Sequence, residues 1–298
     1  MKKKSVRKAY ILSAFAICAI ISIAFISNRS QADEEAGSMY ADAPSDKTID
    51  SVPAPMQEGQ ETEWQAHNGP DTLFEIPVFT HQRKGQRIKH TGYTVHFNTD
   101  WHIPNWVAYQ LTCNETQGEE ERGKHFRPDP DVSEGCPTTH DYTNSGYDRG
   151  HMAPAGDMKW DRRAMDESFY MSNICPQNHN LNAGDWKTLE EKVRDWACEY
   201  GPVYVVCGPI DDGSSPRIGE AKVLVPKAFY KVLLCRRKGK WQSIGFVYEN
   251  KAGHKPLRSY CVSVDSVEKL TGTDFFFLID DDTENTIEST CRPGDWNL

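Results

Sequence analysis

Several features are missing from this chain of 298 residues, and each absence argues against a class of protein. No two cysteines have Cys-x-x-Cys spacing, which disfavours a zinc ribbon or a thioredoxin-like redox site. No Gly-x-Ser-x-Gly is present, which disfavours a serine hydrolase. Positive charge is not in excess: 34 basic and 43 acidic residues give a net charge of −9. The chain therefore does not present a broad basic surface to nucleic acid, although a local basic site is still compatible with this balance.

Long apolar runs are absent except near the N-terminus. A lysine- and arginine-rich start precedes an almost uninterruptedly apolar run over residues 9–26, which is long for a signal-peptide core and short for a membrane span. Ser30-Gln31-Ala32 places small residues where a cleavage site needs them. We predict that residues 1–32 are a signal peptide or a membrane anchor. The rest of the chain would then be exported, either secreted, periplasmic or anchored on the non-cytoplasmic side with its N-terminus associated with the membrane.

Cys18 lies within the apolar run, and the eight cysteines after it are even in number. In an exported protein an even number predicts disulfide bonds, with a minority of the thiols free and buried. The sequence does not choose among the pairings. These eight residues are Cys113, Cys136, Cys175, Cys198, Cys207, Cys235, Cys261 and Cys291.

Composition changes sharply near residue 74. Residues 33–73 are rich in acidic residues, Ser, Pro, Ala and Gln, and cannot bury enough apolar surface to offset the entropy lost on ordering. We predict a flexible acidic linker there and a folded domain over residues 74–298.

Periodicity within this domain predicts an α+β fold with a mainly antiparallel central sheet flanked by helices. Residues 185–200 place Trp and other apolar side chains on one helical stripe, ended by Gly201-Pro202, and residues 263–270 resemble a short helix. A long polar loop is expected over residues 114–146. Strands are expected over residues 90–97, 106–111, 203–207, 223–225, 229–234 and 241–248.

The densest polar cluster is Asp148-Arg149-Gly150-His151. In an extended segment Arg149 and His151 point to the same face, and Gly150 allows close backbone approach or an unusual dihedral. A nearby positive charge disfavours protonation of an imidazole, so Arg149 would keep His151 in the neutral form that a general base needs. Taken alone, the cluster favours a simpler interpretation, a turn that holds a buried structural histidine.

Two further segments carry less information by themselves. The asparagine-rich segment 172–182 is typical of a loop that leads into a helix, because asparagine favours turns and caps. Glu190 and Arg194 are four residues apart on the predicted helix, where a routine ion pair is the simplest interpretation.

Together, the three segments resemble the DNA/RNA non-specific endonucleases of the ββα-metal type. The resemblance covers most of the chain from about residue 75 and is most specific over Gly146–Pro154. It continues from there to Asp157, and it also includes Trp106–Tyr109, Val203–Ile210 and Pro226–Lys231. It implies that residues 74–298 form an endonuclease domain with a ββα-metal active-site motif. The cysteine count exceeds the number usual in the family, which puts the outer loops in doubt rather than the site.

The resemblance also implies roles for individual residues. His151 lies where the family has its general base, and Asn182 where the family has its one direct protein ligand to Mg²⁺, for which Mn²⁺ would substitute. Glu190 matches the acidic residue that orients the water shell of the metal. A neutral amide ligand suits magnesium, which prefers oxygen and keeps several of its waters.

Other matching residues would act on the phosphate. Arg149 and Arg194 match arginines near the scissile phosphate, and Asn173 matches a supporting active-site asparagine. DNA and RNA are the expected substrates, cut with little regard for sequence to give 5′-phosphate and 3′-hydroxyl ends, because phosphate contacts do not read bases. The oligomeric state is not predicted.

Two other functions are compatible with the same residues. One is a phosphodiesterase for another substrate, such as a nucleotide. The other is an inactive, disulfide-stabilised nucleic-acid-binding module on the same scaffold. A local basic groove is a further hypothesis, although charges on a helix more often form a solvated face. Its residues would be Lys159, Arg162, Arg163, Lys187 and Lys192.

Overall fold

The computed structural model describes residues 73–123 and 125–298. The predicted signal peptide or anchor over residues 1–32 and nearly all of the predicted linker lie outside the described residues. Within the described part of the chain, no helix is both long enough and apolar enough to cross a membrane.

A seven-stranded sheet with the order β12-β11-β10-β7-β4-β3-β2 forms the centre of the domain, and every neighbouring pair is antiparallel. The prediction of a mainly antiparallel α+β fold is therefore confirmed. Its strands are β2 (Gln86–Lys89), β3 (Thr94–Asn98), β4 (Ile103–Leu111), β7 (Val203–Ile210), β10 (Ala228–Arg237), β11 (Lys240–Glu249) and β12 (Cys261–Val262). Small two-stranded sheets are formed by β1 (Val78–Phe79) with β13 (Thr273–Asp274), and by β8 (Arg217–Ile218) with β9 (Val223–Leu224).

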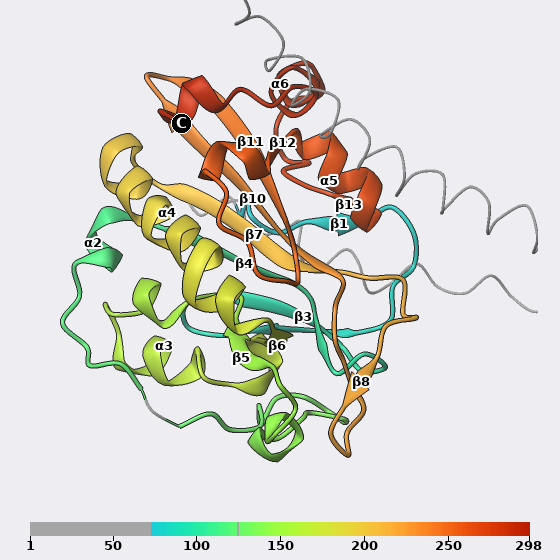
Figure 1. The fold of residues 1–298 in the computed structure, drawn as a ribbon. Coiled ribbons are helices and arrows are strands. Elements are labelled where there is room, and N and C mark those ends of the chain that lie inside the picture. Colours follow the sequence, from blue (N-terminus) through green and yellow to red (C-terminus); the bar gives the residue numbers. More distant parts are fainter. Residues whose placement is uncertain (1–72, 124) are drawn as a thin grey trace, which may run out of the picture. The chain divides into compact units, whose positions relative to one another are not determined.

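Both faces of the central sheet are buried, because alternate side chains of its middle strands enter two different apolar clusters. On β4, Val107 and Tyr109 join one cluster while Trp106 and Ala108 join the other. The first cluster also takes the apolar stripe of helix α4 (Lys187–Tyr200). The second takes residues of α5 (Val264–Thr271), so the two helices cover opposite faces (Figure 1).

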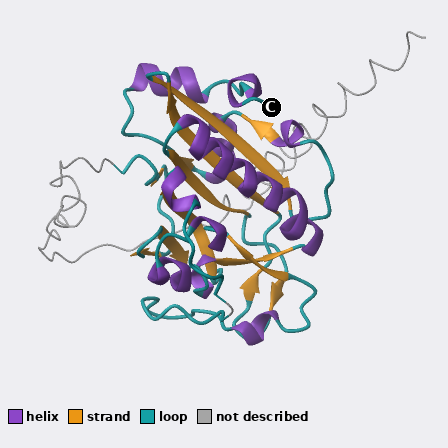
Figure 2. Ribbon diagram, turned by 90° about the vertical axis from the view of Figure 1, so that its left-hand side faces the viewer, coloured by secondary structure: helices purple, strands orange, loops and turns teal. Residues whose placement is uncertain are grey.

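The connection from β4 to β7 begins with the stretch over 114–146, for which the sequence predicts a long loop. That stretch is largely irregular, with α2 (Cys113–Thr116) at its start and a 3-10 turn over Thr139–Tyr142 (Figure 2). Helix α3 (Arg162–Glu167) and helix α6 (Asp281–Glu288) were not predicted. Both are short, with polar exposed faces, so their periodicity is weak.

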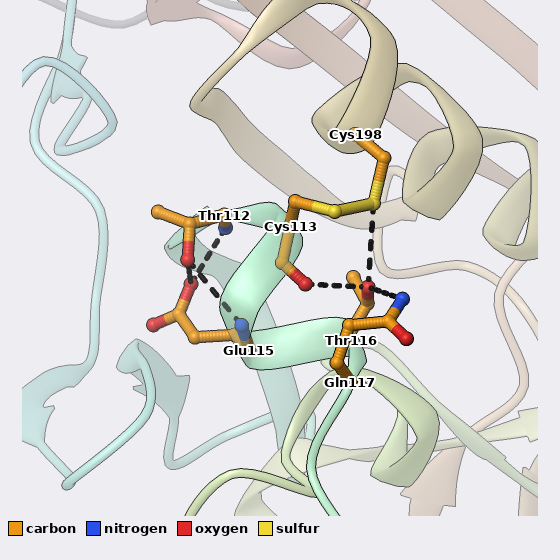
Figure 3. The surroundings of a disulfide bond; sticks show 6 residues. All are labelled: Thr112, Cys113, Glu115, Thr116, Gln117 and Cys198. Atoms are coloured by element: carbon orange, nitrogen blue, oxygen red, sulfur yellow. Dashed lines mark hydrogen bonds between the residues drawn. A yellow bond between two sulfur atoms is a disulfide. The ribbon is translucent and has the colours of Figure 1, made fainter.

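One disulfide, Cys113–Cys198, joins α2 to the last turn of α4 and closes a separation of 85 residues (Figure 3). The start of α2 is further fixed by a capping box, in which Thr112 and Glu115 satisfy each other's backbone N–H groups. The other six cysteines of the described residues are free thiols. The expectation that only a minority would be free is wrong, and three of the six, Cys175, Cys207 and Cys235, are buried as small apolar side chains.

Candidate active site

The active-site motif is built from two short strands and the helix that follows them. Strand β5 (Asp148–His151) pairs antiparallel with β6 (Ile174–Gln177), and a π-helical turn (Leu181–Trp186) then leads into α4. This is the ββα arrangement that the resemblance implies. The sequence did not predict β5 or β6, since each is only four residues long and mixes polar with apolar side chains.

Gly150 is required where β5 and β6 meet. A Cβ at this position would lie 2.2 Å from the side-chain Oε1 of Gln177. Of the two explanations for this glycine, close approach is therefore the correct one.

The imidazole of His151 lies at the end of β5 in an aromatic pocket. Its ring centroid is 5.3 Å from that of Phe126 and 5.0 Å from that of Phe169. The residue is 7% exposed, and its Nε2 has no hydrogen-bond partner among the described residues. Burial, with a smaller contribution from Arg122, lowers the pKa of His151 to about 3. The imidazole is therefore neutral at physiological pH.

Arg149 and His151 point to the same side of β5, as the spacing predicts, because both contact Phe126. The guanidinium of Arg149 lies 4.9 Å from the centroid of the Phe126 ring, and the imidazole of His151 packs against the same ring. Its charge, however, does not govern the imidazole. The cation that opposes protonation of His151 is Arg122, an exposed residue of the long loop. The buried Nε of Arg149 has no partner among the described residues, so this guanidinium keeps donor capacity for an anion.

Asn182 is held beside β5 by Asp148. Its Nδ2 donates to Asp148 Oδ2 at 2.9 Å, and Nδ1 of His179 lies 2.9 Å from the same oxygen. At the opposite end of β5, the indole of Trp186 donates to the backbone carbonyl of His151 at 3.3 Å. The turn that carries Asn182 is thereby tied to both ends of the strand that carries His151.

The backbone around Asn182 departs from regular α-helix. The turn is π-helical, a conformation frequent at functional sites, and Gly184 within it is non-helical at φ −112° and ψ −107°. Asn178 caps the entry, its Oδ1 accepting from the backbone of Asn180 at 3.0 Å. The asparagines therefore do act as turn and cap residues, as their composition predicts.

Glu190 and Arg194 share a face of α4, but the predicted ion pair between them is replaced by another. Arg194 Nη1 lies 2.7 Å from Asp157 Oδ1, and Tyr109 donates its hydroxyl to the other oxygen of Asp157 at 2.9 Å. Burial outweighs Arg194 and raises the pKa of Asp157. Burial likewise raises the pKa of Glu190 to about 7, against the lowering effect of Lys231.

The sequence predicts no functional role for Lys231, although its surroundings are unusual for a lysine. Its side chain is fully buried, its Nζ has no hydrogen-bond partner among the described residues, and it lies 4.7 Å from the Trp186 ring centroid. A lysine in the middle of the apolar strand β10 was the available signal. Asp157 ends the segment Gly146–Asp157 of the resemblance, although no role was predicted for it, and Arg122 occupies no marked position in a pattern.

Asn173 is a structural organiser of this region. It is fully buried, accepts from the backbone N–H of Ala153 at 2.9 Å, and donates to the carbonyls of Ala153 and Ser168 at 2.9 and 2.8 Å. It thus fixes the chain immediately after His151. Its hydrogen bonds in the described structure are all with backbone groups.

The donor set fits a hard divalent cation with few protein ligands. Because Nδ2 of Asn182 is engaged by Asp148, its carbonyl oxygen is left to face a ligand, and Glu190 supplies a carboxylate nearby in the sequence. A cluster of His90, Asp129 and Asp131 also has ligand spacing. That cluster is internally satisfied, since His90 Nε2 and the Ser172 hydroxyl both bond Asp129 Oδ2.

The structure argues against the basic groove. Four of its five residues are paired with nearby carboxylates: Arg162 with Glu120 and Asp166, Arg163 with Glu167, Lys187 with Glu191, and Lys192 with Asp195. The hollow that contains Lys159 and Arg162 is also lined by the glutamates at 119–121. Such a surface is unsuited to a polyanion.

Comparison with known proteins agrees with this geometry. A family model described as DNA/RNA non-specific endonuclease matches residues 71–282. The chain belongs to this family. Its members are metal-dependent nucleases that hydrolyse phosphodiester bonds, so the predicted enzyme class is confirmed at the level of the family.

Individual relatives span vertebrates and fungi. The mitochondrial nuclease EXOG of Xenopus laevis is 40% identical over 198 residues, which is 60% of this chain and 55% of that protein. EXOG of Danio rerio is 37% identical over 72% of this chain and 68% of its own. Nuclease C1 of Cunninghamella echinulata is 33% identical over 65% and 83%. The chain therefore spans little more than half the length of some curated relatives that it matches.

A solved structure gives the same result in three dimensions. A chain of the crystal structure titled as the EndoG/EndoGI complex, on the mechanism of EndoG inhibition, has a TM-score of 0.62 and 31% sequence identity. The match covers 68% of this chain and 89% of that chain. It supports the fold independently of the family model.

The prediction of an exported location is wrong. Relatives from Xenopus laevis, Danio rerio, Mus musculus, Homo sapiens and Schizosaccharomyces pombe are named as mitochondrial nucleases. A basic segment followed by an apolar run does not specify a compartment by itself, which is why the sequence pattern misled.

Proposed function

We propose that this chain is an endonuclease that uses Mg²⁺, replaceable by Mn²⁺, to hydrolyse DNA and RNA without sequence preference. The observation that carries the proposal is the buried, neutral imidazole of His151. Its Nε2 has no hydrogen-bond partner among the described residues, and Asp148 links its strand to Asn182. A buried nitrogen without a partner is costly unless it serves a reaction or a ligand.

His151 would act as general base. A neutral imidazole accepts a proton from the attacking water, which contributes about 10²–10⁴-fold to the rate. The aromatic rings of Phe126 and Phe169 exclude bulk water and keep the imidazole from holding a proton at rest. Asn173 would position His151 by fixing the backbone at Ala153.

Asn182 would be the direct protein ligand of the metal through its amide oxygen, and Glu190 would orient metal-bound water. When bound, such an ion supplies charge stabilisation to the phosphate and a water that protonates the leaving oxygen. Asp148 fixes the amide of Asn182 in one orientation by accepting from its Nδ2. A neutral ligand leaves the charge of the ion available to the phosphate.

Arg149 and Arg194 would bind phosphate oxygens. In the part of the chain that the structure describes, Asp157 engages Nη1 of Arg194 and leaves the rest of its planar fork to donate, and the Nε of Arg149 has no partner. None of these groups reads a base edge, so weak sequence preference follows from the chemistry. DNA and RNA are both accepted if no group contacts the 2′-hydroxyl.

Cleavage of supercoiled plasmid and of a long RNA, with MgCl₂ or with EDTA, tests the proposal. We expect degradation of both polymers with magnesium and none with EDTA. Binding without cleavage would indicate the inactive module. Cleavage of mononucleotide diesters in preference to polymers would indicate a phosphodiesterase with another substrate. Either result would overturn the proposed function.

A further inference from the structure

Helices α5 and α6 lie on the face of the sheet opposite α4 (Figure 1). Acidic side chains from these two helices lie close together. One carboxylate oxygen from each of Asp265, Glu268 and Glu288 lies within 4.8 Å of the other two. Glu284 and Asp274 are close enough to act on Glu288 electrostatically. Five carboxyl groups therefore converge where two helices meet.

Glu288 is the unusual member of this cluster. It is only 3% exposed, and its Oε1 is buried without a hydrogen-bond partner among the described residues. Burial and the neighbouring carboxylates raise the pKa of Glu288 to about 10. A buried, unpaired carboxylate among others is strongly unfavourable unless a positive charge or a proton joins it.

Among the described residues, few positive charges or hydrogen-bond donors offset these carboxyl groups. The ion pair that reaches the cluster is Lys269 Nζ to Asp265 Oδ2, at 4.0 Å and largely exposed. Glu268 accepts one backbone N–H, from Phe275 at 2.9 Å. Neither contact involves the buried oxygen of Glu288.

The ligand set favours a calcium-class ion over magnesium. Ca²⁺ takes several carboxylates directly in a flexible geometry, whereas Mg²⁺ keeps most of its waters and is usually bound through one or two carboxylates. Three carboxylates with oxygens within 4.8 Å of one another therefore suit the larger ion.

We propose that Asp265, Glu268 and Glu288 form a binding site for a calcium-class divalent cation that holds α6 against α5 and the sheet. Helix α6 is otherwise attached by few polar contacts, such as the hydrogen bond from the Ser243 hydroxyl to the Ile287 carbonyl at 2.9 Å. The family match ends at residue 282, so family membership does not account for a site that includes Glu288. The site is separate from Asn182, because α4 and α5 cover opposite faces of the sheet.

Calcium binding to the full chain, measured by isothermal titration and by the thermal midpoint, tests this proposal. We compare the wild type, E268Q/E288Q, and a control that removes two exposed carboxylates outside α5 and α6, E134Q/E191Q. CaCl₂ should raise the midpoint of the wild type and of the control, and E268Q/E288Q should bind at least about tenfold more weakly and lose the shift. The Asn182→Ala variant should keep the shift, which separates this site from the proposed magnesium site.

Two results would overturn the proposal. One is the absence of a calcium shift in the wild type. The other is an equal shift in E268Q/E288Q and the control, since the cluster would then be held by shared protons and calcium would act elsewhere. If E268Q/E288Q fails to fold, the single, more exposed change Asp265→Asn gives the same comparison, with weaker calcium binding expected and unchanged binding contradicting the site.

Discussion

Arg194 on α4 pairs with Asp157, 37 residues earlier in the chain, through an Nη1–Oδ1 distance of 2.7 Å. The carboxylate of Asp157 is almost completely buried, with 1% of its side chain exposed, whereas Arg194 is 24% exposed. The pair joins the segment that follows the His151 strand to the helix that carries Glu190. It therefore positions one of the guanidinium groups proposed to bind phosphate.

Removal of the Arg194 charge should destabilise the domain. Arg194→Met would leave the Asp157 carboxylate buried without its counterion, and we expect the free energy of unfolding to fall by about 3 kcal/mol. Urea denaturation measures this change. The matched control is Arg163→Met: this side chain is 80% exposed where it pairs with Glu167, so its removal should lower the free energy of unfolding much less. Equal losses in the two variants would contradict the structural role of the Arg194–Asp157 pair.

The pH dependence of cleavage should follow Glu190 rather than His151. His151, with a pKa of about 3, is already the neutral base throughout the usual range. Glu190, with a pKa raised to about 7, loses its proton only as the pH rises through that value. If its carboxylate orients metal-bound water, kcat/KM at low magnesium should decrease as the pH falls below about 7. Added magnesium should move this acidic limb of the pH–rate profile to lower pH.

Two variants identify the group responsible for that limb. Glu190→Gln should lower the rate and remove the limb. Lys231→Met removes a buried positive charge that lowers the pKa of Glu190, so the limb should move to higher pH. A limb near pH 6.5 that persists in Glu190→Gln would assign the titration to a histidine instead.

The disulfide should stabilise the fold without taking part in the chemistry. Cys113–Cys198 encloses β5, β6 and most of α4, and the loss of a bond across 85 residues should cost about 2–5 kcal/mol. We expect C113S/C198S to unfold at lower urea while its specific activity, measured when folded, stays at the wild-type level. Dithiothreitol should reproduce the loss in the wild type and add nothing to the variant. No effect of the reductant on the wild type would show that the bond is not formed in solution.

Periodicity was sufficient for the elements that bury a continuous apolar face. Helix α4 and strands β4, β7, β10 and β11 were located because their side chains follow the periods of 3.6 and 2, or form apolar runs. Strands β5 and β6 escaped because their residues are chosen for chemistry and for close packing, as the contact between Gly150 and Gln177 illustrates.

The candidate site was predictable only in part, for a related reason. His151, Asn182 and Glu190 stand in local segments whose order is recognisable in the sequence. Arg122 and Lys231 come from distant segments, and tertiary packing alone brings their charges, and that of Asp157, to bear on His151 and Glu190. Their effect on pKa values depends on burial, which a linear pattern does not contain. The choice of Cys113 and Cys198 as the bonded pair depends on packing in the same way.

The single-turnover cleavage rate of His151→Ala on a linear DNA duplex, with binding measured in the same buffer, tests the central claim most directly. We expect the rate to fall by about 10²–10⁴-fold while the dissociation constant for DNA stays close to that of the wild type, because the imidazole acts on water rather than on the substrate. Free imidazole should restore part of the rate. A variant that cleaves at the wild-type rate would contradict the account.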